Sequence, residues 1–151
     1  MASFAHARGK FDKALYELCE VDYDAVEAYE AAIVRLESQD YKNRLSEFKS
    51  DHERHIQELS NLLKRHNIRA PEGPCSSRQL LVQGRVIFAN LFGDEAILRA
   101  MLANEIDTNI GYELLNDHEE KWEDSGKILR LGVGDERRHK QWFEITLGST
   151  K

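Results

Sequence analysis

The chain is poor in residues that interrupt helices and in residues that cross-link small folds. Its 151 residues include two prolines, nine glycines and two cysteines. So few helix breakers argue against a sandwich of many short strands and favour long helices. Two cysteines, Cys19 and Cys75, cannot form a disulfide framework, but a chain of this length can bury a core without one. We therefore expect one all-α domain that spans residues 1–151.

Other absences narrow the range of functions. No apolar run approaches the length of a membrane span, and the first residues lack the apolar stretch of a secretory signal. The formal net charge is −6, and the lysines and arginines are dispersed, which argues against a surface for nucleic acid. We expect a cytoplasmic protein with reduced cysteines that binds neither nucleic acid nor a membrane.

Apolar residues recur at helical spacing along most of the chain. The predicted helices cover residues 9–36, 40–66, 78–91, 95–115 and 118–146. Both prolines fall in the loop after the second helix, which is the clearest break in the pattern. The predicted organisation is a helix pair over 9–66, a crossover loop and helix over 67–92, and a helix pair over 94–146. Gly132 and Gly134 lie inside the last helix, where they predict a kink or the close approach of a neighbour.

The two helix pairs carry a short internal repeat. Residues 22–30 align with residues 105–113 at an offset of 83, and the alignment superposes a tyrosine and a glutamate. Residues 51–55 align with residues 135–139 at an offset of 84, and this alignment superposes an aspartate and a histidine. The recurrence indicates two related halves. The plainer alternative is two helical hairpins that share only amphipathic character.

Each helix of the two pairs carries polar residues where its apolar face should continue. These residues are Asp22, His52, His55, Glu105, Glu136 and His139. A buried carboxylate without a partner is unfavourable, and three such groups repel one another unless they are protonated or neutralised. A divalent cation relieves this repulsion, and two cations bridged by carboxylates relieve it further. Because Glu136 and His139 are three residues apart, both face one side of their helix and can serve a site inside a bundle.

Plainer interpretations of these residues stay open from sequence. His52 and His55 lie among charged residues and could stand at the solvent edge, with Asp51 as a ligand in place of His52. Glu136 could form an ion pair with neighbouring basic residues on an exposed turn. A hemerythrin-type site is disfavoured, because the positions that would complete its His-x3-His or His-x3-Glu steps hold Ile56, Leu59, Trp122 and Phe143.

On these motifs the sequence resembles the ferritin-like superfamily, which includes the rubrerythrins and bacterioferritins. In that family each helix pair carries a carboxylate on its first helix and Glu-x-x-His on its second, and rubrerythrin-like members add a tyrosine seven residues after the first carboxylate. The second pair matches in full, with Glu105-x6-Tyr112 and Glu136-x2-His139. The first pair matches with two changes, an aspartate in Asp22-x6-Tyr29 and a histidine in His52-x2-His55. The resemblance covers residues 15–143 and is greatest to small bacterial ferritin-like domains of unassigned function.

The resemblance implies a four-helix bundle of two helix pairs with an extra crossover helix, and it implies a role for each site residue. Asp22 and Glu105 resemble terminal carboxylate ligands, Glu136 a bridging ligand, and His55 and His139 terminal nitrogen ligands. Tyr29 and Tyr112 resemble the donors that orient the carboxylates. His52 occupies the second bridging position and departs from the family, which puts the second bridge in doubt.

The implied cofactor is iron, two ions per chain if the site is complete, with zinc or manganese as alternatives. With iron, the implied chemistry is the oxidation of Fe(II) by oxygen or peroxide. The alternative function is a stress-associated scaffold or interaction module whose site is degenerate and turns nothing over. The strongly apolar segment 80–88 leads us to expect a homodimer.

Overall fold

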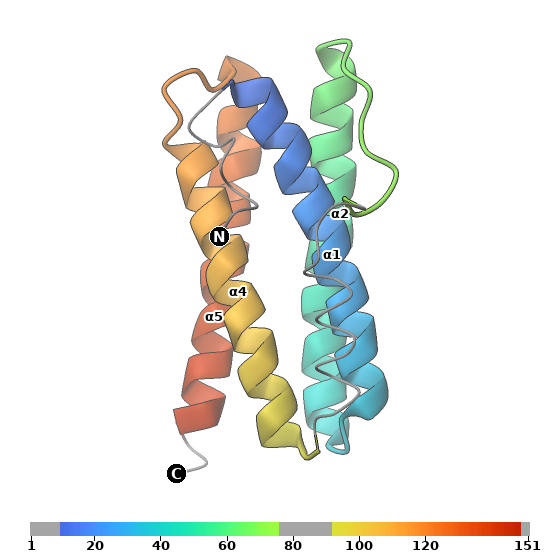
Figure 1. Cartoon of the computed structure of the whole chain (residues 1–151). Coiled ribbons are helices and arrows are strands. Elements are labelled where there is room, and N and C mark those ends of the chain that lie inside the picture. Colours follow the sequence, from blue (N-terminus) through green and yellow to red (C-terminus); the bar gives the residue numbers. More distant parts are fainter. Residues whose placement is uncertain (1–9, 76–91, 149–151) are drawn as a thin grey trace.

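The computed structural model describes residues 10–75 and 92–148, and within these ranges it contains four long α-helices and no strand. The helices are α1 (Phe11–Arg35), α2 (Gln39–Arg65), α4 (Asp94–Asn116) and α5 (Gly126–Gly148), with a short 3-10 turn η2 (Glu123–Ser125) before the last. Helix α1 packs along α2, α4 packs along α5, and α1 also contacts α4 (Figure 1). The all-α prediction is confirmed for the described part of the chain. None of these helices combines the length and apolar character that crossing a bilayer requires.

The turn between α1 and α2 follows the capping pattern of its sequence. Ser38 is the N-cap of α2, and its hydroxyl accepts a hydrogen bond from the Tyr41 N–H at 3.2 Å. The Asp94 carboxylate accepts from the N–H groups of Glu37 and Ser38 at 2.8 and 3.0 Å. Because Asp94 is the first residue of α4, these two bonds tie the first hairpin to the start of the second.

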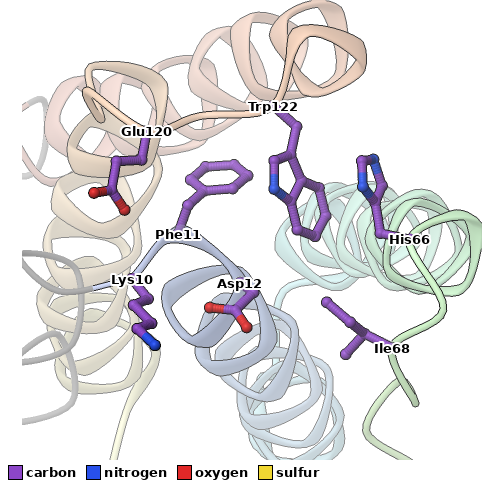
Figure 2. A pocket seen from close by; sticks show the side chains of 7 residues that line it. All are labelled: Lys10, Phe11, Asp12, His66, Ile68, Glu120 and Trp122. Carbon is purple, nitrogen blue, oxygen red and sulfur yellow. The ribbon is translucent and has the colours of Figure 1, made fainter.

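The last helix begins later than the sequence predicted, at Gly126 rather than at residue 118. Trp122, which falls inside the predicted helix over 118–146, lies before α5. Its indole stacks on the His66 ring with a centroid distance of 3.7 Å and meets Phe11 edge-on at 5.1 Å. These contacts hold Trp122 over one end of the bundle, beside an open pocket whose lining Figure 2 shows. The predicted helix over 78–91 and the apolar segment 80–88 lie outside the described residues, so the homodimer stays a prediction.

The core consists of two apolar clusters that are separated by a polar layer. One cluster joins the start of α1, the end of α2, the end of α4 and the start of α5, with Leu15, Leu59 and Leu115 among its members. The other joins the opposite halves of the same helices, with Phe48 and Phe143 among its members. The polar residues singled out from the sequence fall between the two clusters on every helix. The apolar layers above and below them keep water from the centre of the bundle.

Candidate metal centre

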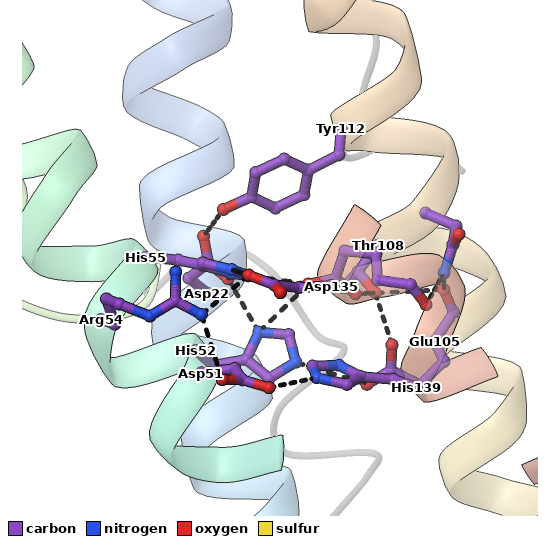
Figure 3. Close-up of polar contacts among 12 residues, drawn as sticks. Asp22, Asp51, His52, Arg54, His55, Glu105, Thr108, Tyr112, Asp135 and His139 are labelled. Carbon is purple, nitrogen blue, oxygen red and sulfur yellow. Dashed lines mark hydrogen bonds and ion pairs between the residues drawn. The ribbon is translucent and has the colours of Figure 1, made fainter. Parts of the chain in front are cut away.

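All six polar side chains predicted for the site are buried near the middle of the four long helices, and Figure 3 labels five of them, all except Glu136. Their residue exposure is 2% for His55 and Glu105 and 0% for the other four. The solvent-edge interpretation of His52 is therefore wrong, as is the interpretation of Glu136 as part of an exposed ion pair. Asp51 keeps 21% of its side-chain surface exposed and lies outside the layer.

The six side chains form two overlapping groups that could hold a metal ion. Asp22, His52, His55 and Glu136 make one group, and His52, Glu105, Glu136 and His139 make the other. In each group, one nitrogen or oxygen from every residue lies within 4.8 Å of all the others. Because His52 and Glu136 belong to both groups, the two candidate positions share one imidazole and one carboxylate.

His52 lies at the centre of the layer between carboxylates from α1 and α4. Its Nδ1 is 2.8 Å from Asp22 Oδ1, and its Nε2 is 3.3 Å from Glu105 Oε1. The Nδ1 atom also lies 3.5 Å from Glu136 Oε1. One imidazole ring therefore contacts all three buried carboxylates.

Hydroxyl groups hold the carboxylates in place. The Tyr112 hydroxyl donates to Asp22 Oδ2 at 2.6 Å, and the Tyr29 hydroxyl donates to Glu105 Oε1. Each tyrosine thus crosses from its own hairpin to the carboxylate of the other. The Thr108 hydroxyl donates to Glu136 Oε2 at 2.8 Å, which leaves Glu136 Oε1 directed at the centre. These contacts match the carboxylate-orienting role that the resemblance implies for the two tyrosines.

Gly132 provides the space for one of these rings. A Cβ added at Gly132 would lie 2.6 Å from Tyr112 Cδ1, which is far closer than real carbon atoms approach. A Cβ added at Gly134 would meet nothing within 4 Å. The close approach predicted for the glycines of this helix therefore occurs at Gly132, and it seats the tyrosine that binds Asp22.

Two aspartates that sequence analysis did not assign to this role hold the outer sides of the histidines. His55 Nε2 is 2.9 Å from Asp135 Oδ2, and His139 Nε2 is 2.8 Å from Asp51 Oδ2. A carboxylate acceptor fixes the proton on Nε2, so the Nδ1 lone pair of each ring faces the centre. Asp51 and Asp135 occupy equivalent positions in the repeat, and that equivalence was the signal that could have identified both.

Two arginines close the layer on its solvent side. Arg54 donates to Asp51 at 3.0 Å and to Asp135 at 2.8 Å. Arg138 donates to Asp135 at 3.2 Å and also to Asp51. Arg54 and Arg138 are themselves 84 residues apart, so the outer layer follows the repeat of the helices.

The three carboxylates of the layer differ in their pKa values. Burial alone would raise the pKa of Asp22, but the hydrogen bond to His52 and the nearby His55 imidazole hold it below its ordinary value. Burial is likewise outweighed at Glu105, where the nearby imidazoles of His139 and His52 lower the pKa well below the usual range. Burial and the nearby charge of Glu105 raise the pKa of Glu136 well above the usual range. The surroundings therefore favour the ionised form of Asp22 and Glu105 and the protonated form of Glu136.

The histidine nearest the centre responds to the same charges. Burial would lower the pKa of His52, but the surrounding carboxyl groups of Glu136, Asp22 and Glu105 raise it well above 6.5. Burial is also outweighed at His55, whose pKa is raised by the hydrogen bond from Nε2 to Asp135 and by the Asp22 carboxylate, 3.4 Å from Nδ1. The layer as a whole thus attracts positive charge, which protons or a metal ion can supply.

Three atoms of the layer are buried without a hydrogen-bond partner: His55 Nδ1, His139 Nδ1 and Glu136 Oε1. A buried polar atom without a partner costs about 1–3 kcal/mol. All three atoms belong to the two candidate metal groups, and a bound cation would satisfy each of them. The imidazole and carboxylate donors fit iron, zinc or manganese.

A family model described as a domain of unknown function (DUF2383) matches residues 10–117 of the chain. Among solved structures, a conserved hypothetical protein from Mycobacterium tuberculosis (rv2844) is similar in fold, with a TM-score of 0.75 and 15% identity over 93% of each chain. At that identity the likeness shows the fold alone. No curated protein matches the chain. The family match covers more than half of the residues, so the chain belongs to the DUF2383 family.

Proposed function

We propose that this member of the DUF2383 family binds divalent metal ions in the polar layer of a ferritin-like bundle. The observation that supports this most strongly is the set of three orphaned ligand atoms on His55, His139 and Glu136. A polar layer that served only to join helices would be expected to satisfy its own buried atoms. Here the outer nitrogen of each terminal histidine is hydrogen-bonded to an aspartate, whereas the inner nitrogen makes no hydrogen bond and lies 3.4 Å (His55) or 3.6 Å (His139) from a carboxylate oxygen of the layer.

Iron is the metal we propose, at about two ions per chain when both overlapping groups are filled. Zinc and manganese are the alternatives for the same donors. If iron is bound, it would supply the redox chemistry, in which Fe(II) is oxidised by oxygen or peroxide. The chain would supply the ligands, the tyrosines that orient Asp22 and Glu105, and the apolar clusters that keep the centre dry.

Metal content tests this proposal. The untagged protein is expressed with iron, zinc and manganese available, passed through gel filtration and measured by elemental mass spectrometry. We expect metal to co-elute with the chain and to be lost in His139→Ala. The matched control is His66→Ala, because His66 pairs with Asp124 and lies about 16 Å along α2 from His55. Metal content that is unchanged in a helical His139→Ala protein would contradict the proposal.

A second candidate function is the metal-free scaffold, and the position of His52 favours it. A protonated His52 ring would satisfy Asp22 through one nitrogen and Glu105 through the other, with no metal present. Under this alternative, Glu105→Leu removes a buried charge and should leave stability unchanged or raised. Under the metal proposal, the same substitution abolishes the stabilisation that added metal gives. Thermal unfolding with and without zinc distinguishes the two.

A further inference from the structure

We infer, on the basis of the proposed function, that the two halves of the centre bind metal unequally and that the half with Glu105 and His139 takes the first ion. His52 determines this order. The half with Asp22 and His55 fills second and more weakly.

The imidazole of His52 is shared by the two candidate metal groups. Both candidate groups require a nitrogen of His52, which presents Nδ1 to the Asp22 side and Nε2 to the Glu105 side. A neutral imidazole carries one N–H and one lone pair. It can therefore ligate a metal on one side while it donates a hydrogen bond on the other, but it cannot ligate both. Glu136, the other shared residue, is a carboxylate whose two oxygens carry about four lone-pair sites, so it can ligate on both sides and imposes no such choice.

The hydrogen bonds indicate which side of His52 is the donor. The Nδ1 atom is 2.8 Å from Asp22 Oδ1, a normal hydrogen-bond length, whereas Nε2 is 3.3 Å from Glu105 Oε1. Because a carboxylate can only accept, the shorter contact holds the Nδ1 proton more tightly than the longer contact holds the Nε2 proton, so a metal that displaces one proton of the ring takes the place of the proton on Nε2. The Nε2 lone pair then faces Glu105 and is available to a metal.

The carboxylates differ in the same sense. Both oxygens of Asp22 are already engaged, Oδ1 by His52 and Oδ2 by the Tyr112 hydroxyl at 2.6 Å. Glu105 Oε2 has only a 3.5 Å contact with the Thr108 hydroxyl, which is 2.8 Å from Glu136 Oε2. The aspartate side chain is also one methylene shorter than that of Glu105. A metal on the Asp22 side must therefore displace the His52 Nδ1–H that is bonded to Asp22 Oδ1, whereas Glu105 has an oxygen with no short contact to offer.

The first ion would then have four protein ligands: Glu105, Glu136, His139 Nδ1 and His52 Nε2. Two carboxylates balance the charge of a divalent cation, and four nitrogen and oxygen ligands suit zinc in particular. The Asp22 side would keep its hydrogen bonds to His52 and Tyr112. A second ion would have to displace the proton of His52 Nδ1.

Zinc binding to the metal-free full-length chain tests the order, with isothermal titration calorimetry as the readout. We expect one tight zinc ion per wild-type chain, followed by weaker binding of a second. His139→Ala should weaken the tight step by about 100-fold or more, since a direct ligand counts for at least as much as an outer one. His55→Ala should leave the tight step within about threefold and abolish the weak one. The opposite pattern, or two equal tight steps in the wild type, would overturn the order.

A third variant and a spectroscopic measurement make the test independent of these two alanine variants. His52→Glu supplies an oxygen to each side, so we expect it to bind two zinc ions with similar affinity. In the wild type, nitrogen-15 chemical shifts of His52 should show Nε2 ligated and Nδ1 protonated after one equivalent of zinc. A ligated Nδ1 would overturn the order while leaving the proposed function standing. No zinc binding by any form of the chain would overturn both.

Discussion

The hairpin α1–α2 and the hairpin α4–α5 present the same outer contacts to the centre but different inner ligands. Each supplies an aspartate to the histidine of the other, an arginine that crosses between the two aspartates, and a tyrosine that binds the carboxylate of the other. Their inner ligands differ at two positions, where Asp22 corresponds to Glu105 and His52 corresponds to Glu136, and agree at the third, where His55 corresponds to His139. Both differing positions lie in the candidate metal groups.

The outer aspartates, arginines and tyrosines join the two hairpins, whereas the inner ligand positions determine which ions the layer can bind. The outer layer is paired across the two hairpins, and a change in one hairpin would leave a buried partner in the other without its contact. The inner positions can change as long as the charge of the layer is balanced. If the proposed centre binds metal, His52, which stands where the other hairpin has Glu136, should affect the number and order of bound ions rather than the fold.

Metal removal should have the largest effect on stability. A ligand that binds only the folded chain stabilises it by about 4 kcal/mol at a concentration about 1,000-fold above its Kd. We expect a stabilisation of this size when zinc is added to the wild-type chain. His139→Ala should lose most of it, and His55→Ala should keep it. Urea unfolding followed by circular dichroism measures the difference, and equal losses in the two variants would contradict unequal halves.

The pH dependence of the metal-free chain should run opposite to that of metal binding. The pKa values of His52 and Glu136 are raised in the folded chain, so their contributions to stability are lost as pH rises through those values. The pKa values of Asp22 and Glu105 are lowered in the folded chain. Their contributions to stability are therefore lost only in acid, as the pH falls below the ordinary carboxyl pKa of about 4.

We therefore expect the Tm of the metal-free chain to fall as pH rises above about 6.5, the ordinary pKa of histidine, because the pKa of His52 lies higher in the folded chain. The gain in Tm on adding zinc should grow over the same range, because the ion replaces the protons. Calorimetric scans with and without zinc check both trends. A metal-free Tm that rises throughout this range would contradict the charge balance described for the layer.

Substitution of Gly132 tests the contact through which α5 supports Asp22. Gly132→Ala puts a methyl group into the Tyr112 ring, and overpacking of this kind costs about 1–3 kcal/mol. Gly134→Ala on the same helix meets nothing, and it should stabilise the chain by about 0.5–1 kcal/mol through helix propensity. Urea unfolding of the two variants measures this contrast. Equal effects on the free energy of unfolding would show that the Tyr112 ring can move away from residue 132 without destabilising the chain.

The outer aspartates allow the two halves to be weakened separately. Asp51 is hydrogen-bonded to His139, and Asp135 is hydrogen-bonded to His55. Asp51→Asn should therefore lower the affinity for the first zinc ion by about 10–100-fold. Asp135→Asn should spare the first ion and weaken the second. Glu58→Gln is the matched control, because Glu58 contacts Arg54 from the exposed face of α2. If both asparagine variants weakened the first ion equally, the assignment of one aspartate to each half would fail.

The tyrosines should give the smallest effects. Tyr29→Phe removes a hydrogen bond to Glu105 that contributes about 1 kcal/mol. The affinity for the first ion should therefore fall by less than about tenfold. Tyr112→Phe removes a hydrogen bond to Asp22 and should leave the first ion unchanged. Zinc titration compares the two. A larger loss in Tyr112→Phe would place the first ion on the Asp22 side.

Sequence alone could predict the four described helices and which side chains face the core, because both follow from a local period of 3.6 residues. It could not predict where α5 begins. The residues before Gly126 are held by contacts of Trp122 with His66 and Phe11, which lie far away in sequence. Local periodicity carries no information about such contacts.

The same limit applies to the site. Periodicity placed Asp22, His52 and Glu105 on buried faces, and the structure brings them together. It could not pair Asp51 with His139, because that contact joins two hairpins at a distance set by the packing of the bundle. Only the internal repeat pointed to Asp51 and Asp135 as an equivalent pair.

The most direct test of the metal centre is the elemental analysis of wild-type protein after gel filtration, beside His139→Ala and His66→Ala. The account predicts at least about one metal ion per chain in the wild type and in His66→Ala, and none in a fully helical His139→Ala protein. A wild-type chain that is folded and helical, yet free of metal after expression with iron, zinc and manganese supplied, would contradict it.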